Sequence, residues 1–292
     1  MTMKNTFIII LLVVISTTLK AQIERPKWEM GGGIRLNYMG LNGGLSGYRY
    51  SDGMTYDLNY EDIGMNTYSP SFAVALGGRY KKWNLEFAGS KGSYNGSFIT
   101  PADMVRDDMQ IDSGSVVNGT VDMSMYALFT NFALIQRQHD LGVGIGIMLL
   151  NMGTNYTTYD VNSEEVKLGG DQWFPMPFLV ISGRLKFNKF RINISGGGAI
   201  YKGEMDDVDY DVKYYTVDIS AAYDFLEAGR WGFSADIGYR DLYMDLKMTN
   251  DMGWYKENDI YRGPYATIRA KFSSEEMWRY VKRKDRNKES NN

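Results

Sequence analysis

Acidic side chains form the densest set of possible metal ligands in this 292-residue chain, which has 35 Asp and Glu against 32 Lys and Arg. Asp206, Asp207, Asp209 and Asp211 stand close together, and carboxylate oxygens are the ligands that divalent cations such as Ca²⁺ prefer. The cluster lacks the glycine and the spacing of an EF-hand loop. A divalent cation at this segment is therefore one hypothesis and a solvated acidic loop is the other. No other cofactor is expected.

These acids lie between segments in which large apolar residues alternate with small or polar ones, a pattern typical of β-strands. In the segment 231–247, for example, Trp231 and Phe233 alternate with Ser234 and Asp236. In the segment 119–135 either face could be the apolar one. Ten such segments occur, at about 28–39, 71–80, 83–94, 119–135, 141–156, 173–187, 190–202, 210–225, 231–247 and 256–272.

The connections between these segments alternate in length. Those after the second, fourth, sixth and eighth segments are short, and most of the others are longer and acidic, at about 41–70, 95–118, 157–172, 203–209 and 248–255. Aromatic residues gather at both ends of the segments. Those at the short-turn ends include Trp28, Tyr80, Trp83 and Phe272, and those expected at the long-loop ends include Tyr38, Tyr94, Trp173, Tyr214, Tyr215, Tyr243 and Tyr261.

A membrane barrel has short turns on one side, longer loops on the other, and an aromatic girdle at each interface. A soluble sandwich has no reason to alternate its connections in this way. The pattern predicts an all-β fold, a transmembrane antiparallel up-and-down β-barrel of ten strands, with eight or twelve strands as alternatives. Its long acidic, tyrosine-rich loops are expected outside the cell.

The last segment carries a more specific signal. It runs from Tyr265 to Phe272, with Ile268 and Phe272 on one face. It resembles the C-terminal insertion signal of the outer-membrane β-barrel superfamily of Gram-negative bacteria, which the barrel-assembly machinery reads. The resemblance implies an integral outer-membrane protein surrounded by lipid and lipopolysaccharide. Twenty residues follow Phe272, whereas many members of that superfamily end there.

The face opposite the apolar one carries charges that we expect to line the lumen: Arg35, Arg79, Glu86, Arg184, Arg191, Asp218, Asp236, Arg240 and Arg269. Because barrel diameter grows with strand number, a ten-stranded lumen is narrow. We expect salt bridges to fill it, which favours a structural or surface-binding role. The alternative is a narrow porin-like channel for small solutes.

Enzyme chemistry has little support. The chain has no cysteine and one histidine, His139, which excludes a thiolate nucleophile. A serine triad or a His-Asp protease pair needs a histidine beside its acid. His139 is expected in a short turn, at the opposite end from the acidic loops. No Gly-x-Ser-x-Gly elbow is present, so we expect a protein that is not an enzyme.

The two ends of the chain are expected to lie outside the barrel. Residues 1–21 combine Lys4, the apolar run 7–15 and a small-residue stretch ending at Ala21, the pattern of a cleaved secretory signal peptide. The apolar run is shorter than the ~20 residues of a membrane-spanning helix. We assign 22–272 to the barrel and 273–292 to a basic periplasmic tail. The formal net charge of −3 gives no indication of nucleic-acid binding.

Overall fold

The computed structural model describes residues 27–51, 53, 55–61, 68–99, 104–106, 109–111, 113–136, 139–159, 165–205 and 207–274. The predicted signal peptide and the tail beyond Ser274 lie outside these residues. The strands are β1 (Trp28–Arg49), β2 (Thr55–Asn59), β3 (Tyr68–Tyr80), β4 (Trp83–Ile99), β5 (Met104–Arg106), β6 (Met109–Ile111), β7 (Val116–Gln136), β8 (Asp140–Tyr159), β9 (Glu165–Phe187), β10 (Phe190–Met205), β11 (Val208–Ala228), β12 (Trp231–Asn250) and β13 (Gly253–Ser273). In this part of the chain, no helix has the length and apolarity needed to cross a membrane.

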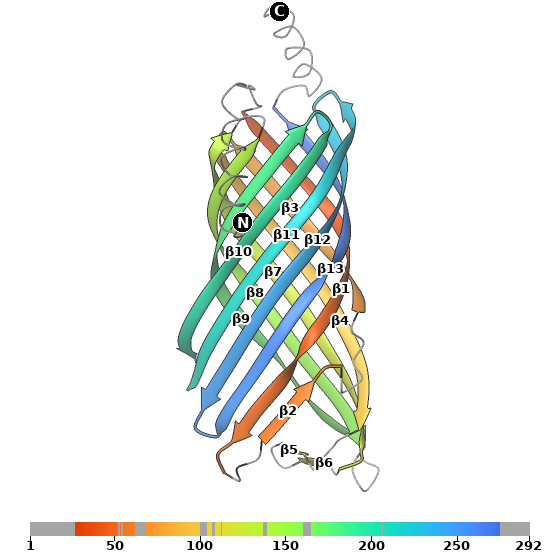
Figure 1. Cartoon of the computed structure of the whole chain (residues 1–292), viewed down its shortest axis with the longest axis vertical. Helices are drawn as coiled ribbons and strands as arrows, with labels where there is room; N and C mark the ends of the chain where they lie inside the picture. Colours follow the sequence, from red (N-terminus) through yellow and green to blue (C-terminus); the bar gives the residue numbers. More distant parts are fainter. Residues whose placement is uncertain are drawn as a thin grey trace, which may run out of the picture.

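Ten antiparallel strands close into one ring, which confirms the predicted fold class (Figure 1). The order around the ring is β1, β3, β4, β7, β8, β9, β10, β11, β12 and β13, and β13 pairs back to β1 from Glu29–Ser273 to Arg49–Gly253. β2 is an addition, paired with Gly44–Tyr48 of β1 beyond the point where β3 ends. Ring closure leaves no unpaired sheet edge to face lipid.

One end of the barrel, here called the turn end, consists of short turns as predicted. Lys81–Lys82 joins β3 to β4, Asn188–Lys189 joins β9 to β10, and Gly229–Arg230 joins β11 to β12. Lys81, Asn188 and Gly229 have φ values of 53°, 57° and 59°, in the left-handed region that tight turns use. The Lys81 N–H donates to the carbonyl of Lys27 at 2.9 Å, so β1 begins at this end.

At the opposite end, here called the loop end, the strands run further than predicted. β9 begins at Glu165, inside the expected loop 157–172, and β1 continues to Arg49. β12 and β13 meet at the turn Asp251–Met252, so the expected loop 248–255 is mostly strand. The expectation of long loops was wrong here because these segments still alternate with period two, although their apolar residues have changed face.

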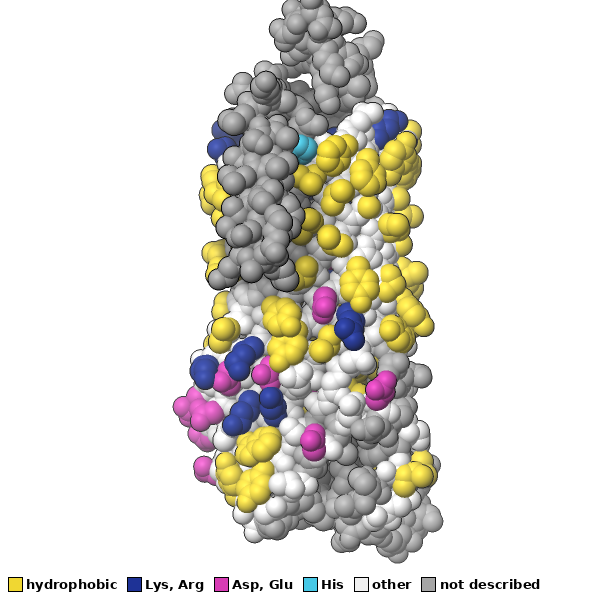
Figure 2. Space-filling model, in the orientation of Figure 1, with side chains coloured by type: hydrophobic (Ala, Val, Ile, Leu, Met, Phe, Trp, Pro, Cys, Tyr) yellow, Lys and Arg dark blue, Asp and Glu magenta, His cyan; other side chains and the backbone are white. Residues whose placement is uncertain are grey.

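The half of β11 nearest the turn end has an apolar outer face. Val217 and Ile219 point outward with about half of their surface exposed, whereas Asp218 points inward and is buried. Exposed apolar side chains cover this part of the barrel on the face seen in Figure 2. We call this part the belt half. Its polar interior and apolar exterior are those of a strand surrounded by lipid.

The other half of β11 has the opposite polarity without any change in alternation. Tyr210 and Val212 point inward and are buried, whereas Asp209 and Lys213 point outward into solvent. Lys, Arg, Asp and Glu side chains accordingly appear on the lower part of the molecule in Figure 2. We call this part the loop-end half. Its pattern is that of a water-soluble β-protein with an apolar core.

Stacked aromatic pairs on the outer surface mark the level at which the polarity changes. They are Tyr215–Tyr243 (ring centroids 4.8 Å apart), Tyr38–Tyr68 (5.5 Å) and Tyr126–Trp173 (6.1 Å). Trp83–Phe132 (5.0 Å) and Trp231–Phe272 (5.0 Å) form the girdle at the turn end. On β11, Tyr215 and Phe225 are ten residues apart, which at ~3.3 Å per residue and a tilt of ~40° gives a belt about 25 Å high.

Two seams divide the loop-end half into two facing sheets. β9 and β10 pair only where Phe190–Gly198 faces Leu179–Phe187, and β3 and β4 pair only up to Phe72–Lys91. β4, β7, β8 and β9 therefore form one sheet, and β10 to β13 with β1 and β2 form the other. Phe174–Tyr210 (5.7 Å) and Tyr94–Tyr261 (5.9 Å) bridge the two sheets. The closed barrel becomes a β-sandwich beyond the belt.

The strand whose lipid face was ambiguous from the sequence has a clear orientation in β7. Tyr126 and Leu128 are exposed on the outer surface, and Met123, Met125 and Ala127 face the interior. Met123 belongs to the core of the loop-end half, which explains why its face looked apolar enough for lipid.

Candidate functional site

A layer of charges around Asp218 extends into the lumen of the belt half from four neighbouring strands, β11, β12, β13 and β1. Asp218 Oδ2 accepts hydrogen bonds from Arg35 Nη1 at 3.2 Å and from Arg240 Nε and Nη2 at 3.0 and 2.9 Å. Its Oδ1 accepts one from the Tyr265 hydroxyl. The Arg35 guanidinium also lies 3.8 Å from the centroid of the Tyr265 ring and donates to Thr267 at 3.3 Å. These hydrogen bonds satisfy the polar groups that the layer buries inside the lumen.

The other predicted lumen charges lie between this layer and the turn end. The ion pairs are Arg191–Asp224 at 2.9 Å, Arg269–Asp236 at 3.0 Å, Arg79–Glu29 at 3.1 Å and Arg184–Asp140 at 3.6 Å. Glu86 is half-buried on the same inward face. Glu29 and Asp140 were not among the predicted lumen residues. Glu29 is the second residue of β1 and Asp140 is the first residue of β8, both at the turn end.

The structure does not gather the predicted aspartate cluster into a metal site. Asp206 lies outside the described residues, Asp207 occupies a turn with φ 59°, and Asp209 and Asp211 are on the outer face of β11. Lys202 pairs with Asp211 at 2.6 Å, and this contact lowers the pKa of the Asp211 carboxyl. The described part of the chain contains no group of three or more His, Cys, Asp or Glu that could hold a metal ion.

The last strand places the predicted insertion-signal residues on both of its faces. Ile268 is 66 % exposed on the lipid face, whereas Tyr265 points into the lumen. The Phe272 ring lies between Trp28 (5.7 Å) and Trp231 (5.0 Å) at the turn-end girdle. β13 continues to Ser273, and the Ser274 N–H donates to the Trp28 carbonyl at 3.0 Å. Backbone pairing thus extends past Phe272, where we expected it to stop.

The interior of the loop-end half is a closed apolar core. Tyr94, Tyr214 and Tyr261 belong to it, so their predicted place in the outer girdle was wrong. Tyr214 adjoins the true girdle residue Tyr215 and points to the opposite face, as period two requires. The buried core residues are Met39, Leu41, Tyr60, Tyr94, Val117, Val121, Met123, Met148, Leu150, Phe174, Met176, Tyr210, Val212, Tyr214, Leu242, Met244, Leu246 and Tyr261.

Two carboxylates are enclosed in this core. Glu257 and Asp259 are 3 % and 0 % exposed and point inward from β13. Glu257 accepts hydrogen bonds from the hydroxyls of Tyr60 at 2.7 Å and Tyr255 at 2.9 Å, and Asp259 accepts one from Tyr261 at 3.0 Å. Neither carboxylate forms an ion pair with any described residue. Both acids lie in the segment 256–272 that the sequence predicts as a strand, but their burial was not predicted.

Burial controls the protonation of this pair. Burial, and then the charge of Glu257, raise the pKa of Asp259 well above its usual range, and burial also raises the pKa of Glu257. The hydrogen bonds from Tyr60 and Tyr255 oppose this rise at Glu257, because they favour its charged form. Oδ1 of Asp259 is buried without a hydrogen-bond partner among the described residues.

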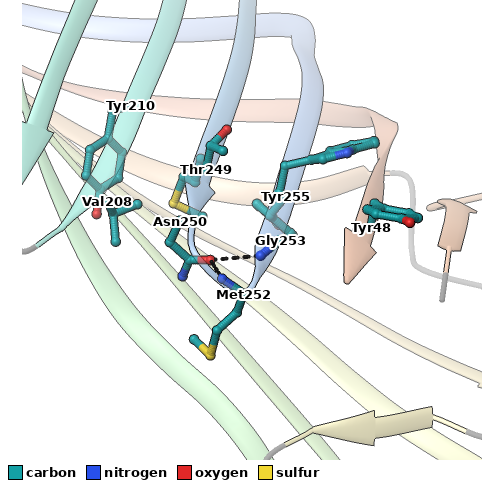
Figure 3. Close-up of a pocket in the computed structure, with 10 residues that line it drawn as sticks. Tyr48, Val208, Tyr210, Thr249, Asn250, Met252, Gly253 and Tyr255 are labelled. Atoms are coloured by element: carbon teal, nitrogen blue, oxygen red, sulfur yellow. Dashed lines mark hydrogen bonds between the residues drawn. The ribbon is translucent and has the colours of Figure 1, made fainter. Parts of the chain in front are cut away.

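A pocket of about 350 Å³ opens at the loop end, beside the turn that joins β12 to β13 (Figure 3). Asn250 shapes its rim, because its side-chain oxygen accepts hydrogen bonds from the N–H groups of Met252 (3.0 Å) and Gly253 (3.1 Å). The Tyr50 N–H fixes the turn to β1 by donating to the Met252 carbonyl at 2.9 Å. The lining residues are Tyr48, Val208, Tyr210, Met248, Thr249, Asn250, Met252, Gly253, Trp254 and Tyr255.

Comparison with known proteins adds little on function. No family model and no curated protein matches this chain. It is similar to the outer membrane protease OmpT from Escherichia coli, with 11 % identity, 84 % of this chain and 96 % of that chain covered, and a TM-score of 0.47. It is also similar to the translocator domain of the autotransporter NalP from Neisseria meningitidis, with 12 % identity, 89 % of this chain and 95 % of that chain covered, and a TM-score of 0.35. A Pseudomonas aeruginosa FadL homologue is similar too, with 10 % identity, 85 % of this chain and 90 % of that chain covered, and a TM-score of 0.33. Such distant likenesses transfer no role, and the fold assignment rests on the ring, belt and girdles of this chain.

Proposed function

We propose that this chain is an integral outer-membrane barrel with a closed lumen, whose loop end serves as a structural or ligand-binding surface. The observation that carries this proposal is the apolar core of the loop-end half. Val121, Met244 and Tyr261 in that core are at most 1 % exposed. A solute that entered from the turn end would meet the ion pairs near that end first, the Asp218 layer next and this core last.

The outer-membrane location is supported by the physics of the belt. A β-structure can cross a lipid bilayer only as a closed barrel, because every backbone group must be hydrogen-bonded. The girdles of this chain lie about 25 Å apart, close to the height of the apolar band of outer-membrane barrels. The predicted signal peptide would export the chain towards that membrane.

A narrow porin-like channel is less well supported. Porin lumens are polar and filled with water, whereas this lumen changes from ion pairs to apolar side chains along its length. Conduction would require the displacement of both layers. The Asp218 layer alone involves three charged side chains that are between 12 % and 27 % exposed.

Planar-bilayer recording of the refolded full-length chain tests the proposal. We expect no stable conductance steps. Heat-modifiable migration and protease resistance of the same preparation would show that the barrel has folded and inserted, so that silence reflects a closed lumen. Stable and reproducible single-channel steps would overturn the proposal in favour of the channel.

A further inference from the structure

An apolar groove of about 510 Å³ lies on the outer surface of the barrel near the turn end. Its floor is Gly78 of β3, which pairs with Met30 of β1 on one side and with Leu85 of β4 on the other. Met30 and Leu85 are 60 % and 57 % exposed and stand outward as the two side walls. Because Gly78 has no side chain, the space between these walls stays open.

Three girdle residues border the groove on the side of the turn end. Trp28, Tyr80 and Trp83 stand opposite one another on neighbouring strands, since Trp28 pairs with Tyr80 and Tyr80 with Trp83. Aromatic residues in such a row mark the level at which acyl chains meet lipid headgroups. The groove therefore extends from the headgroup level into the part of the belt that acyl chains surround.

Three exposed lysines stand directly beyond these aromatic residues. Lys81 and Lys82 form the turn from β3 to β4, and the Lys81 N–H holds Lys27 beside them by donating to its carbonyl at 2.9 Å. The Lys81 ammonium lies 5.2 Å from the centroid of the Tyr80 ring, and that of Lys82 lies 5.8 Å from the centroid of the Phe132 ring. Two of the three charges thus lie at the level of the girdle.

The acid that lines the groove has a partner of its own. Glu29 pairs with Arg79 at 3.1 Å, and the two side chains are only 24 % and 9 % exposed. The lysines at the mouth of the groove therefore face the headgroup region with their charge. Lysines at a membrane surface attract anionic lipids, and ammonium groups form charge-assisted hydrogen bonds with phosphate oxygens.

From this geometry we propose that the groove binds one anionic phospholipid from the leaflet at the turn end. An acyl chain lies over Gly78 between Met30 and Leu85, and the headgroup phosphate lies at Lys81 and Lys82. The volume of the groove is within the range of sites that hold small organic ligands. The inference goes beyond the proposed function, because the groove faces the membrane and does not depend on whether the lumen conducts.

Native mass spectrometry of the refolded full-length chain in detergent tests the proposal with a matched pair of lipids. Dioleoylphosphatidylglycerol carries a net negative charge, and dioleoylphosphatidylcholine has the same acyl chains without it. From an equimolar mixture we expect the barrel to retain about fivefold more of the anionic lipid. Raising the ionic strength before detergent exchange should reduce this preference. Equal retention of the two lipids, or no retained lipid, would overturn the proposal.

A double variant tests the charge at the mouth of the groove. Lys81→Asn with Lys82→Gln removes two ammonium groups, and Asn is chosen because Lys81 has a φ of 53°, which Asn tolerates. We expect this variant to retain the two lipids equally. The matched control is Lys189→Gln, which removes an exposed lysine from the turn between β9 and β10 and should keep the preference. An undiminished preference in the folded double variant would overturn the role of the lysines.

A second variant tests the groove itself, and it decides the matter even if the double variant does not fold. A Cβ atom at Gly78 would lie 3.6 Å from the Glu29 carbonyl oxygen and 4.0 Å from Met30 Cγ, so Gly78→Leu fills the groove without displacing the backbone. It should lose most of the retained lipid of both kinds, while heat-modifiable migration shows that the barrel has folded.

The matched control for the groove is Gly196→Leu. Gly196 pairs with the outward residue Val217 in the belt, and a Cβ atom there would lie 3.5 Å from the Thr216 carbonyl oxygen. This variant adds the same side chain to the lipid-facing surface away from the groove and should retain lipid as the unmodified chain does. Equal losses in Gly78→Leu and Gly196→Leu would show that the belt retains lipid over its whole surface and would overturn the site.

Discussion

Replacing Asp218 by Asn would remove the negative charge that two lumen arginines share. Asp218 Oδ2 contacts Arg35 at 3.2 Å and Arg240 at 2.9 Å. The side chains of Asp218 and Arg35 are 12 % and 14 % exposed, so the Arg35 guanidinium would remain in the lumen with little access to water. We expect Asp218→Asn to reduce the free energy of unfolding for this reason.

The size of the effect follows from the burial of the three groups. Removing one partner of a buried ion pair costs about 3–5 kcal/mol, because the other charge stays buried and unpaired. Arg240 is 27 % exposed and can recover some hydration, and Asn keeps one acceptor for the Tyr265 hydroxyl. Both facts place the expected loss near the lower end, at about 3 kcal/mol.

Urea unfolding of the refolded barrel, followed by tryptophan fluorescence, measures this loss through the shift of the transition midpoint. The matched control is Asp245→Asn, which breaks pairs with Lys213 and Lys256 on the outer surface. Their lysine side chains are 53 % and 42 % exposed, and such pairs contribute about 0–1 kcal/mol. A loss below about 1 kcal/mol for Asp218→Asn would refute the view of the layer as a buried, charge-satisfied plug.

Three further predictions concern the last strand, the buried acids and the polarity switch. Phe272→Ala removes a ring packed between two girdle tryptophans. It should lower the amount of assembled barrel in the outer membrane far more than truncation after Ser274 does. A larger loss of assembled barrel for the truncation would show that the closing strand is misplaced. Burial raises the pKa of Asp259 in the folded state, so its contribution to stability is complete below the ordinary carboxyl pKa of about 4 and is lost as the pH rises through the raised value. Asp259→Asn should therefore flatten the fall of the urea midpoint between pH 5 and pH 9. An unchanged slope would contradict this. Ile219→Lys in the belt should cost about 2–4 kcal/mol, whereas Asp211→Lys beyond the girdle should cost much less, as measured by unfolding in lipid vesicles; equal costs would put the belt boundary elsewhere.

The belt half could be predicted from the sequence because two independent signals agree there. Alternation assigned the lipid face, and turn residues such as Lys81–Lys82 and Asn188–Lys189 fixed the ends of the strands. Each lumen charge then followed from parity alone, since Asp218 must face away from Val217 and Ile219.

The loop-end half could not be predicted in the same way, because its apolar residues change from the outer to the inner face of the strands. The burial of Glu257 and Asp259 could not be predicted, because Tyr60, which donates to Glu257, lies on a distant segment of the chain. A usable signal did exist in β11. Tyr210 and Val212 lie inside the predicted segment 210–225 and share the parity of the buried Asp218, so they could have been assigned to the inner face.

In β11 the alternation of inward and outward residues continues without a break past Tyr215, where the apolar face changes side, and this limits which insertions the strand can accept. Inserting one residue beside Tyr215 would turn Tyr210 and Val212 outward and Lys213 inward, while the belt half kept its orientation. The strand would then present a continuous apolar outer face along nearly its whole length. One inserted residue in each strand would thus convert a barrel that carries a sandwich outside the bilayer into one whose outer surface is apolar from end to end. Insertions at this level should accordingly be far less tolerated than insertions at the turn Asp251–Met252.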